Sequence, residues 1–339
     1  MSAPGLSRAR DSVKAVLDRA QRAARTPAGR AIVALVGLGI VALALAHAEP
    51  TRVWASIVRC AAVIPVVFVL EALYSVLELL ALRDLYGADR QKLPLSELLR
   101  AGLIAFAMGG VMPMGRPVVE SVRGVALARW TSGARAAAAG TRLQYLLLLS
   151  QALLCVPCVL AALVLPAPSI LLVAILINAA ITFVMGAGLY LAARRGALAS
   201  RLPMISKRAA ELAPQLDEHL REDTGLPQRA VAFVLVGRGV QVLQYTVLVG
   251  VLVGELDLLR GLGIVGVQMV GSSLADVLPT HLGGTEALAP LGATTLCVPL
   301  SDALAIPLVI HAVQATWIVL GLAAYVLWPA RSLTSEQRA

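Results

Sequence analysis

Long apolar runs alternate with short polar and basic segments along most of the chain. An apolar run of about 20 residues is long enough to cross the hydrocarbon core of a bilayer as a helix. By this pattern the sequence predicts six full transmembrane helices, at 31–48, 61–82, 143–165, 169–193, 230–253 and 304–328. We therefore expect an all-α polytopic membrane protein. The composition agrees, because only 14% of the 339 residues are charged, against about 25% in an ordinary soluble domain.

The lysines and arginines indicate how these helices are oriented. Of the 29 basic residues, 25 lie in five segments, which are 1–30, 83–100, 116–142, 194–229 and the tail 329–339. Because basic loops stay on the cytoplasmic side, these segments and both chain ends are predicted to be cytoplasmic. The membrane is predicted to be the cytoplasmic (inner) membrane. Orientation and anionic lipid account for the net charge of +9, so no nucleic-acid partner is expected.

Two further apolar stretches, 101–115 and 261–299, are interrupted by glycine and proline. The first lies between two cytoplasmic segments, and the second must begin and end outside, so a single crossing fits neither. Each is predicted to be a re-entrant hairpin, one from each face, in an inverted-repeat-like arrangement. A full crossing is the alternative for the first stretch. The residues expected at the hairpin turns are Gly109, Gly110, Pro113 and Gly115 in the first and Pro279, Gly283 and Gly284 in the second.

Two of the cytoplasmic segments are amphipathic. Segment 1–30 alternates basic with apolar residues, and in 194–229 apolar residues recur at three- and four-residue spacing from Leu202 to Leu220. Such helices bind along the membrane interface, which we expect here in preference to a partner site. The predicted organisation is a basic N-terminal segment 1–30, a transmembrane domain 31–328 that includes the interfacial loop 194–229, and a cytoplasmic tail 329–339.

Ionisable residues inside a membrane span are costly, and they usually face a cavity or a partner. Arg238 lies about eight residues into its helix, and Gln241 and Tyr245 share its face because residues three and four apart align on a helix. A buried guanidinium with its fork of donors suits a lipid phosphate or another anion. The alternative is that Arg238 extends to the cytoplasmic headgroups.

Carboxylates and histidines supply the remaining candidates. Glu71 and Glu78 share a face with Tyr74 and are expected to pair with Arg238, to bind protons, or to form a structural salt bridge. His311 and Gln314 lie on the last span, where a lone histidine is more often a hydrogen-bonding residue than a proton relay. The complete set predicted to bind substrate is Arg238, Gln241, Tyr245, Arg116, Glu120, Asp276, His281, Glu286, Glu71 and Glu78.

Sequence signatures of catalysis are absent. The chain contains no metal-ligand spacing, nucleophile elbow, Walker loop or dinucleotide fingerprint, so neither an enzyme, a cofactor nor an ATP-driven pump is predicted. All four cysteines fall in apolar segments, which excludes a disulfide framework. Cys155 and Cys158 form a C-x-x-C pair, which we interpret as buried membrane cysteines in preference to a redox or metal site.

Three stretches carry a family resemblance. They are "GGVMPMGRPVVESVRGVALARW", "AAAAGTRLQYLLLL", and a late motif in which Pro279 precedes Gly283, Gly284 and Glu286. Together they resemble the flippase-like membrane domain of lysylphosphatidylglycerol synthases and related stand-alone proteins, over most of 30–328. The resemblance implies movement of lipids, such as aminoacylated phospholipids, across the cytoplasmic membrane, or service in lipid and hopanoid pathways. The soluble aminoacyl-transferase domain is absent from the chain, so synthesis is not implied.

We therefore expect a flippase that moves an anionic phospholipid or lipid-linked substrate between leaflets, with membrane lipids as its partners. The headgroup would pass along a groove lined by Arg238, Glu286, His281 and Arg116. Two alternatives remain open. One is a secondary transporter of a small anion or ion that uses Glu71 and Glu78 for coupling, and the other is a non-catalytic scaffold for a lipid-modifying enzyme.

Overall fold

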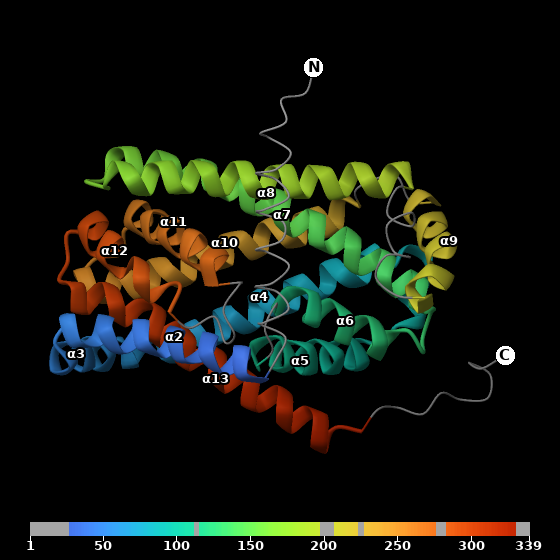
Figure 1. Cartoon of the computed structure of the whole chain (residues 1–339), viewed down its shortest axis with the longest axis horizontal. Helices are drawn as coiled ribbons and strands as arrows, with labels where there is room; N and C mark the ends of the chain where they lie inside the picture. The colour runs from blue at the N-terminus through green and yellow to red at the C-terminus, as the bar shows by residue number, and fades with distance from the viewer. Residues whose placement is uncertain (1–26, 112–114, 197–206, 223–226, 276–282, 330–339) are drawn as a thin grey trace.

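The molecule is a bundle of helices. The axes of the long helices lie roughly along the length of the bundle, and the chain runs in both directions (Figure 1). The computed structural model describes residues 27–111, 115–196, 207–222, 227–275 and 283–329. Within these ranges every regular element is helical and there is no strand, which confirms the all-α prediction. Six of the described helices are long and apolar enough to cross a membrane. The chain is therefore a multi-pass membrane protein.

Five of these six helices coincide with predicted spans. They are α3–α4 (Pro50–Cys60 and Ile64–Leu85, joined by the turn η1, Ala61–Val63), α7 (Gly133–Val164), α8 (Ser169–Arg195), α10 (Gln228–Val253) and α13 (Leu300–Leu327). The predicted first span corresponds to α2 (Pro27–His47), whose side chains are described from residue 35 onward. The sixth long apolar helix is α11 (Leu258–Ala275), inside the stretch predicted as the second hairpin.

Hairpin 1 consists of α5 (Leu95–Val111) and α6 (Gly115–Leu127), which pack against each other. Both arms lie in the half of the bundle that also carries α9 (Figure 1). The predicted hairpin was too short, because its second arm was assigned to the loop 116–142. Gly109 and Gly110 lie inside α5 and not in the turn, and Pro113 is outside the described residues.

Hairpin 2 consists of α11, the short turn η5 (Glu286–Leu288) and α12 (Ala289–Leu296), and its two arms also pack together. It lies in the opposite half of the bundle from hairpin 1 (Figure 1). Gly283 has a φ of 94°, a backbone conformation that glycine adopts without strain. Gly283 and Gly284 thus sit at the return of the hairpin as predicted, whereas Pro279 is outside the described residues.

The same order of elements occurs twice along the chain. A long helix, a hairpin and a second long helix form the series α4, hairpin 1, α7, and the series recurs as α10, hairpin 2, α13. The second series runs in the opposite direction along the bundle (Figure 1). Equivalent helices also pack equivalently: α4 lies against α10, while α5 lies against α13 and α11 against α7. These relations confirm the inverted-repeat-like arrangement.

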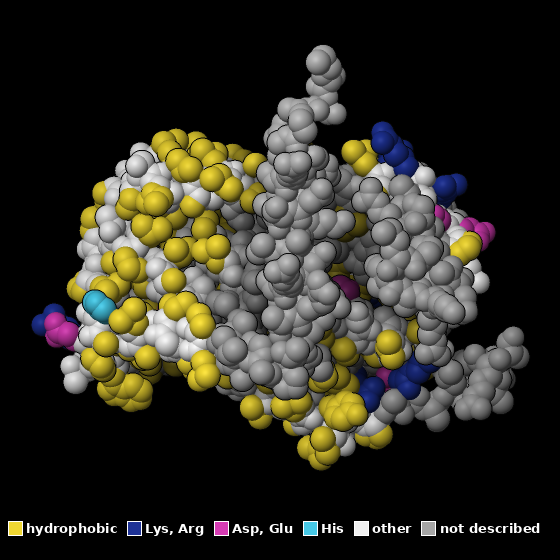
Figure 2. Space-filling view, viewed as in Figure 1, with side chains coloured by type: hydrophobic (Ala, Val, Ile, Leu, Met, Phe, Trp, Pro, Cys, Tyr) yellow, Lys and Arg dark blue, Asp and Glu magenta, His cyan; other side chains and the backbone are white. Residues whose placement is uncertain are grey.

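Basic residues gather at one end of the bundle, which we call the basic end. Figure 2 shows Lys and Arg side chains concentrated there, while apolar side chains spread over much of the remaining visible face. This end carries η2 (Gly87–Lys92) and α9 (Lys207–Glu222). The buried residues Leu216 and Leu220 of α9 pack against the bundle, and Arg142 Nη2 on α7 donates a hydrogen bond of 2.6 Å to the His219 carbonyl oxygen. The described apolar face of the predicted amphipathic helix is thus covered by protein.

Candidate functional site

Charged side chains from both repeats are buried between the central helices. On α4, α6 and α10 these residues are Glu71, Glu78, Arg123 and Arg238, and on η5 the residue is Glu286. A buried charge is tolerated only when it is paired and hydrogen-bonded. The partners of these groups therefore determine what the site can do.

The Arg123 cluster joins hairpin 1 to α4. Arg123 Nη1 lies 2.7 Å from Glu78 Oε1 and 3.1 Å from Glu120 Oε1, so one guanidinium bridges two carboxylates. Glu120 and Arg123 are three residues apart on α6 and therefore face the same way. On the other side of this cluster, a Cβ atom added at Gly140 of α7 would lie 3.1 Å from Glu120 Oε2. The glycine thus leaves room for the carboxylate.

A second polar contact crosses the interface between α4 and α10. Gln244 Nε2 donates a hydrogen bond of 2.9 Å to Glu71 Oε2, and both side chains are buried. Tyr245, the next residue on α10, is buried in the central hydrophobic cluster. The predicted face with Glu71 and Glu78 therefore does point into the protein, as expected for costly charges at membrane depth.

Arg238 is held by the protein on three sides. Its Nε donates to Ser150 Oγ at 3.1 Å, its Nη2 to the Leu147 carbonyl at 3.0 Å, and its Nη1 to Gln241 Oε1 at 3.0 Å. Arg238 and Gln241 were predicted to share a helical face, and their side chains form a hydrogen bond. The side chain is buried, so it does not extend to the headgroups as the alternative required. Two of its partners, Ser150 and Leu147, lie on α7, so Arg238 links α10 to α7.

The Glu286 cluster joins the tip of hairpin 2 to α13. Glu286 is fully buried, and its Oε2 accepts hydrogen bonds of 2.9 Å from the Gly283 N–H and from Thr285 Oγ1. Its Oε1 lies 3.2 Å from His311 Nε2 on α13. His311 Nε2 is also 3.2 Å from Thr285 Oγ1. The carboxylate is thus held by its own hairpin and contacts a titratable group on the neighbouring span.

Three of the predicted site residues cannot be placed in these clusters. Asp276 and His281 lie outside the described residues, and Arg116 lies in α6 at a position where side chains are not described. The residues that the sequence-based set omitted are Arg123, Gln244, Ser150, Thr285 and His311. The spacing of Arg123 from Glu120 was a usable signal, because residues three apart share a helical face. For Ser150 and Gln244 the decisive contact comes from another helix, which no local pattern reveals.

Cys155 and Cys158 are buried and free, as expected for membrane cysteines. Asn178 Nδ2 donates a 3.8 Å hydrogen bond to Cys155 Sγ, and Ser273 Oγ donates to Asn178 Oδ1 at 2.7 Å. These contacts link α7, α8 and hairpin 2. Among the described residues no group of three or more His, Cys, Asp or Glu is placed to hold a metal ion.

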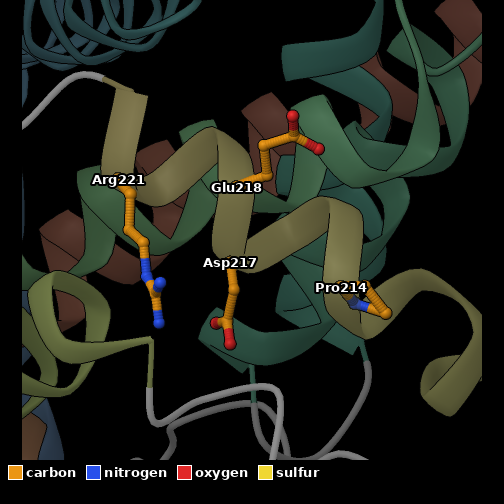
Figure 3. A pocket seen from close by; sticks show the side chains of 4 residues that line it. All are labelled: Pro214, Asp217, Glu218 and Arg221. Carbon is orange, nitrogen blue, oxygen red and sulfur yellow. The ribbon is translucent and has the colours of Figure 1, made fainter.

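The basic end carries a buried tyrosine and a surface pocket. Burial, reinforced by the nearby Glu120 carboxylate, raises the pKa of the Tyr86 phenol, which therefore stays protonated. A surface pocket of about 470 Å³ lies on α9 and is lined by Pro214, Asp217, Glu218 and Arg221 (Figure 3). Arg221 Nη2 donates to the Arg195 carbonyl at 3.3 Å, so this arginine caps the end of α8. None of the buried charges described above lines the pocket.

Comparison of the chain with models of known protein families, with curated proteins and with solved structures found no match. Contacts of Arg123, Arg238 and Glu286 link separate elements: Arg123 joins α6 to α4, Arg238 joins α10 to α7, and Glu286 joins hairpin 2 to α13. In membrane proteins with inverted repeats, substrate and ion sites lie at the interface between the repeats, where helices are broken.

Proposed function

We propose that this chain is a membrane transporter that moves an anionic phospholipid or a lipid-linked substrate between the two leaflets. The observation that carries the proposal is the pair of opposed hairpins, each holding buried charged residues against the long helices. Ionisable groups at membrane depth are expensive, and they mark substrate or ion pathways by default. Broken helices in an inverted repeat are the usual setting of such pathways.

The charges suit an amphiphilic anion. Arg238 and Arg123 provide guanidinium groups, whose planar fork matches the oxygens of a phosphate. In the observed arrangement their donors contact protein oxygens. A phosphate headgroup entering between the hairpins would take over these contacts while its acyl chains remained in lipid. A resemblance to the flippase-like domain of lysylphosphatidylglycerol synthases, noted from the sequence, supports the same substrate class.

The orientation in the membrane belongs to this proposal as well. Lysines and arginines are concentrated at the end of the bundle that carries η2 and α9. By the positive-inside rule this end would face the cytoplasm, in the cytoplasmic (inner) membrane. Hairpin 1 would then enter from the cytoplasmic side and hairpin 2 from the outer side.

A second candidate function is a secondary transporter for a small anion or ion. Glu71 and Glu78 favour it, because both are buried carboxylates on one face of α4. Such a transporter would take up its solute in response to an ion gradient without exchanging lipids. Uptake of a labelled small anion in the same vesicles separates the two functions.

The test is lipid exchange in vesicles of phosphatidylcholine and phosphatidylglycerol that contain fluorescent phosphatidylglycerol. With the wild-type chain, we expect dithionite to quench label from both leaflets, whereas in protein-free vesicles it quenches the outer leaflet alone. Arg238→Gln should lose exchange because the headgroup loses a bidentate partner. Arg90→Gln is the matched control, since Arg90 is exposed and pairs with Asp84 at the basic end.

Arg238 also fastens α10 to α7, so thermal unfolding of the same samples must be recorded. Gln241→Leu is a second variant that alters the same face without removing the charge, and we expect it to slow exchange. If vesicles with the wild-type chain behave like protein-free vesicles, or if Arg238→Gln exchanges lipid at the wild-type rate while folded, the proposal is wrong.

A further inference from the structure

The two hairpins neutralise their buried carboxylates in different ways. In hairpin 1, Glu120 contacts Arg123, which also pairs with Glu78 on α4 and whose guanidinium stays charged at any physiological pH. In hairpin 2, Glu286 contacts His311, and histidine side chains change charge between about pH 5 and 8. The carboxylate of hairpin 1 thus has a permanent counter-charge, and the carboxylate of hairpin 2 has a titratable one.

The geometry ties this titratable contact to the position of hairpin 2. Glu286 is anchored to its own hairpin by the Gly283 N–H and the Thr285 hydroxyl, both at 2.9 Å. His311 belongs to α13, the long helix that follows the hairpin, and its side chain is 17% exposed while that of Glu286 is 0% exposed. Among the described residues, the ionic link between these two elements is therefore one that a proton can switch.

The other charged groups whose side chains are described on the surrounding elements are engaged elsewhere. The elements that pack on η5 are α2, α11, α12 and α13. On α11, Arg260 pairs with Glu255 and Asp257, and on α13, Asp302 pairs with Arg59. On α2, His47 Nδ1 bonds to the Leu43 carbonyl. His311 is therefore the titratable partner that contacts Glu286 within the described part of these elements.

We propose that Glu286 and His311 form a proton-binding site that couples proton movement to the opening of hairpin 2. This inference rests on the proposed transport function and supplies its driving force. A proton from the aqueous phase binds the imidazole, and the resulting imidazolium and carboxylate form a neutral pair that holds hairpin 2 against α13. When the proton leaves to water, a fully buried carboxylate remains without a counter-charge. Such a group is costly, so the hairpin opens and the carboxylate becomes hydrated.

The first measurement compares lipid exchange with and without a pH gradient across the vesicle membrane. For the wild-type chain, the ratio of the two rates should differ from one. In Glu286→Gln and His311→Gln the ratio should fall to one, because the proton-binding pair is gone. His219→Gln is a matched control: His219 lies on α9, its side chain contacts Arg135 at the basic end, and this variant should keep the wild-type ratio.

The second measurement does not depend on lipid exchange. Spin labels on Ala287→Cys, beside Glu286 on η5, and on Thr316→Cys, on α13, report the distance between hairpin 2 and α13 when the exposed native Cys297 is replaced by serine. Between about pH 8 and 5, the range over which histidine titrates, this distance should shorten in the wild-type background. The change should be lost in His311→Gln and Glu286→Gln and kept in His219→Gln.

The two measurements separate the two proposals. A pH-dependent distance without any lipid exchange would contradict the proposed function and leave the proton site standing. Lipid exchange whose rate ratio and label distance are the same in His311→Gln as in the wild type would overturn the proton site and leave the transport function standing. If Glu286→Gln does not fold, His311→Gln decides both outcomes.

Discussion

The arginine of hairpin 1, Arg123, pairs with a carboxylate of its own helix and with one on α4, whereas the carboxylate of hairpin 2 contacts a histidine on the next span. Both hairpins occupy equivalent places in the inverted repeat, so the difference lies in side-chain chemistry. The arginine keeps its charge, and breaking its contacts would deprive the buried Glu78 and the half-buried Glu120 of this cation. The histidine can lose its charge, and its contact can then be released. Hairpin 1 is therefore expected to be the anchored half of the repeat and hairpin 2 the switchable half.

The hairpins also differ in what surrounds the glycine nearest the tip of each. In hairpin 2, a Cβ atom added at Gly284 would lie 2.6–2.9 Å from the Cβ, Cα and N atoms of Ala275 on α11. In hairpin 1, a Cβ atom added at Gly110 would meet the end of the Ile318 side chain at 2.5 Å. A side-chain end can rotate away, but a backbone cannot. The tip of hairpin 2 is therefore the less tolerant of added volume.

The largest expected effect comes from removing the anchor of hairpin 1. Arg123→Gln leaves Glu78 and Glu120 without their shared cation, and breaking a buried ion pair costs about 3–5 kcal/mol of unfolding free energy. Thermal unfolding in detergent, followed by tryptophan fluorescence, measures the loss. Arg90→Gln removes an exposed pair and should cost about 0–1 kcal/mol. Equal stability of the two variants would show that hairpin 1 is not anchored by Arg123.

An intermediate effect is expected at the contact that holds the carboxylate of hairpin 2. Thr285→Val keeps the shape of the side chain but removes the hydroxyl that donates to Glu286. Hydrogen bonds to charged groups contribute about 1.5–3 kcal/mol, so unfolding should become easier by that amount. Thr316→Val is the control, because the exposed Thr316 hydroxyl bonds only to a carbonyl of its own helix among the contacts described. A loss no greater than that of the control would argue against a structured Glu286 site.

The smallest effect distinguishes the packing of the two hairpins. Gly284→Ala should cost about 1–3 kcal/mol, as overpacking against a fixed backbone does, and Gly110→Ala should cost less because Ile318 can move. Gly239→Ala, on α10 with open space beside it, should be neutral or stabilising by up to about 1 kcal/mol, owing to the better helix propensity of alanine. Chemical denaturation of the three variants gives the order. The comparison fails if Gly110→Ala is the more destabilised hairpin variant.

Apolar periodicity located the long helices but misplaced parts of hairpin 1. The stretch 116–142 reads as a basic loop, yet 115–127 is the helix α6. The reason is that Glu120 and Arg123 point inward, where they neutralise each other and Glu78. A hydropathy pattern counts these residues as solvent-exposed, since it cannot tell a charge paired inside the protein from one in water.

In the candidate site, too, the relations within one helix were predictable from the sequence and the contacts between helices were not. The sequence correctly grouped Arg238 with Gln241 and placed Glu71 and Glu78 on one face, because these relations follow from the geometry of a single helix. It left open whether Arg238 meets those carboxylates or the headgroups. The described hydrogen bonds of Arg238 instead run to Gln241 and to Ser150 and Leu147 of α7, a choice fixed by how two distant helices pack.

By itself, the sequence determined that this is an all-α membrane protein with long apolar helices, two glycine- and proline-broken stretches and a strongly basic side. Those properties depend on the length and local order of apolar and basic residues. Only the tertiary structure decided which charges meet, and in particular that Glu286 contacts His311 while Glu120 and Glu78 share Arg123. Partners separated by 25 or 45 residues come together through helix packing, and packing depends on the shapes of all the neighbouring helices at once.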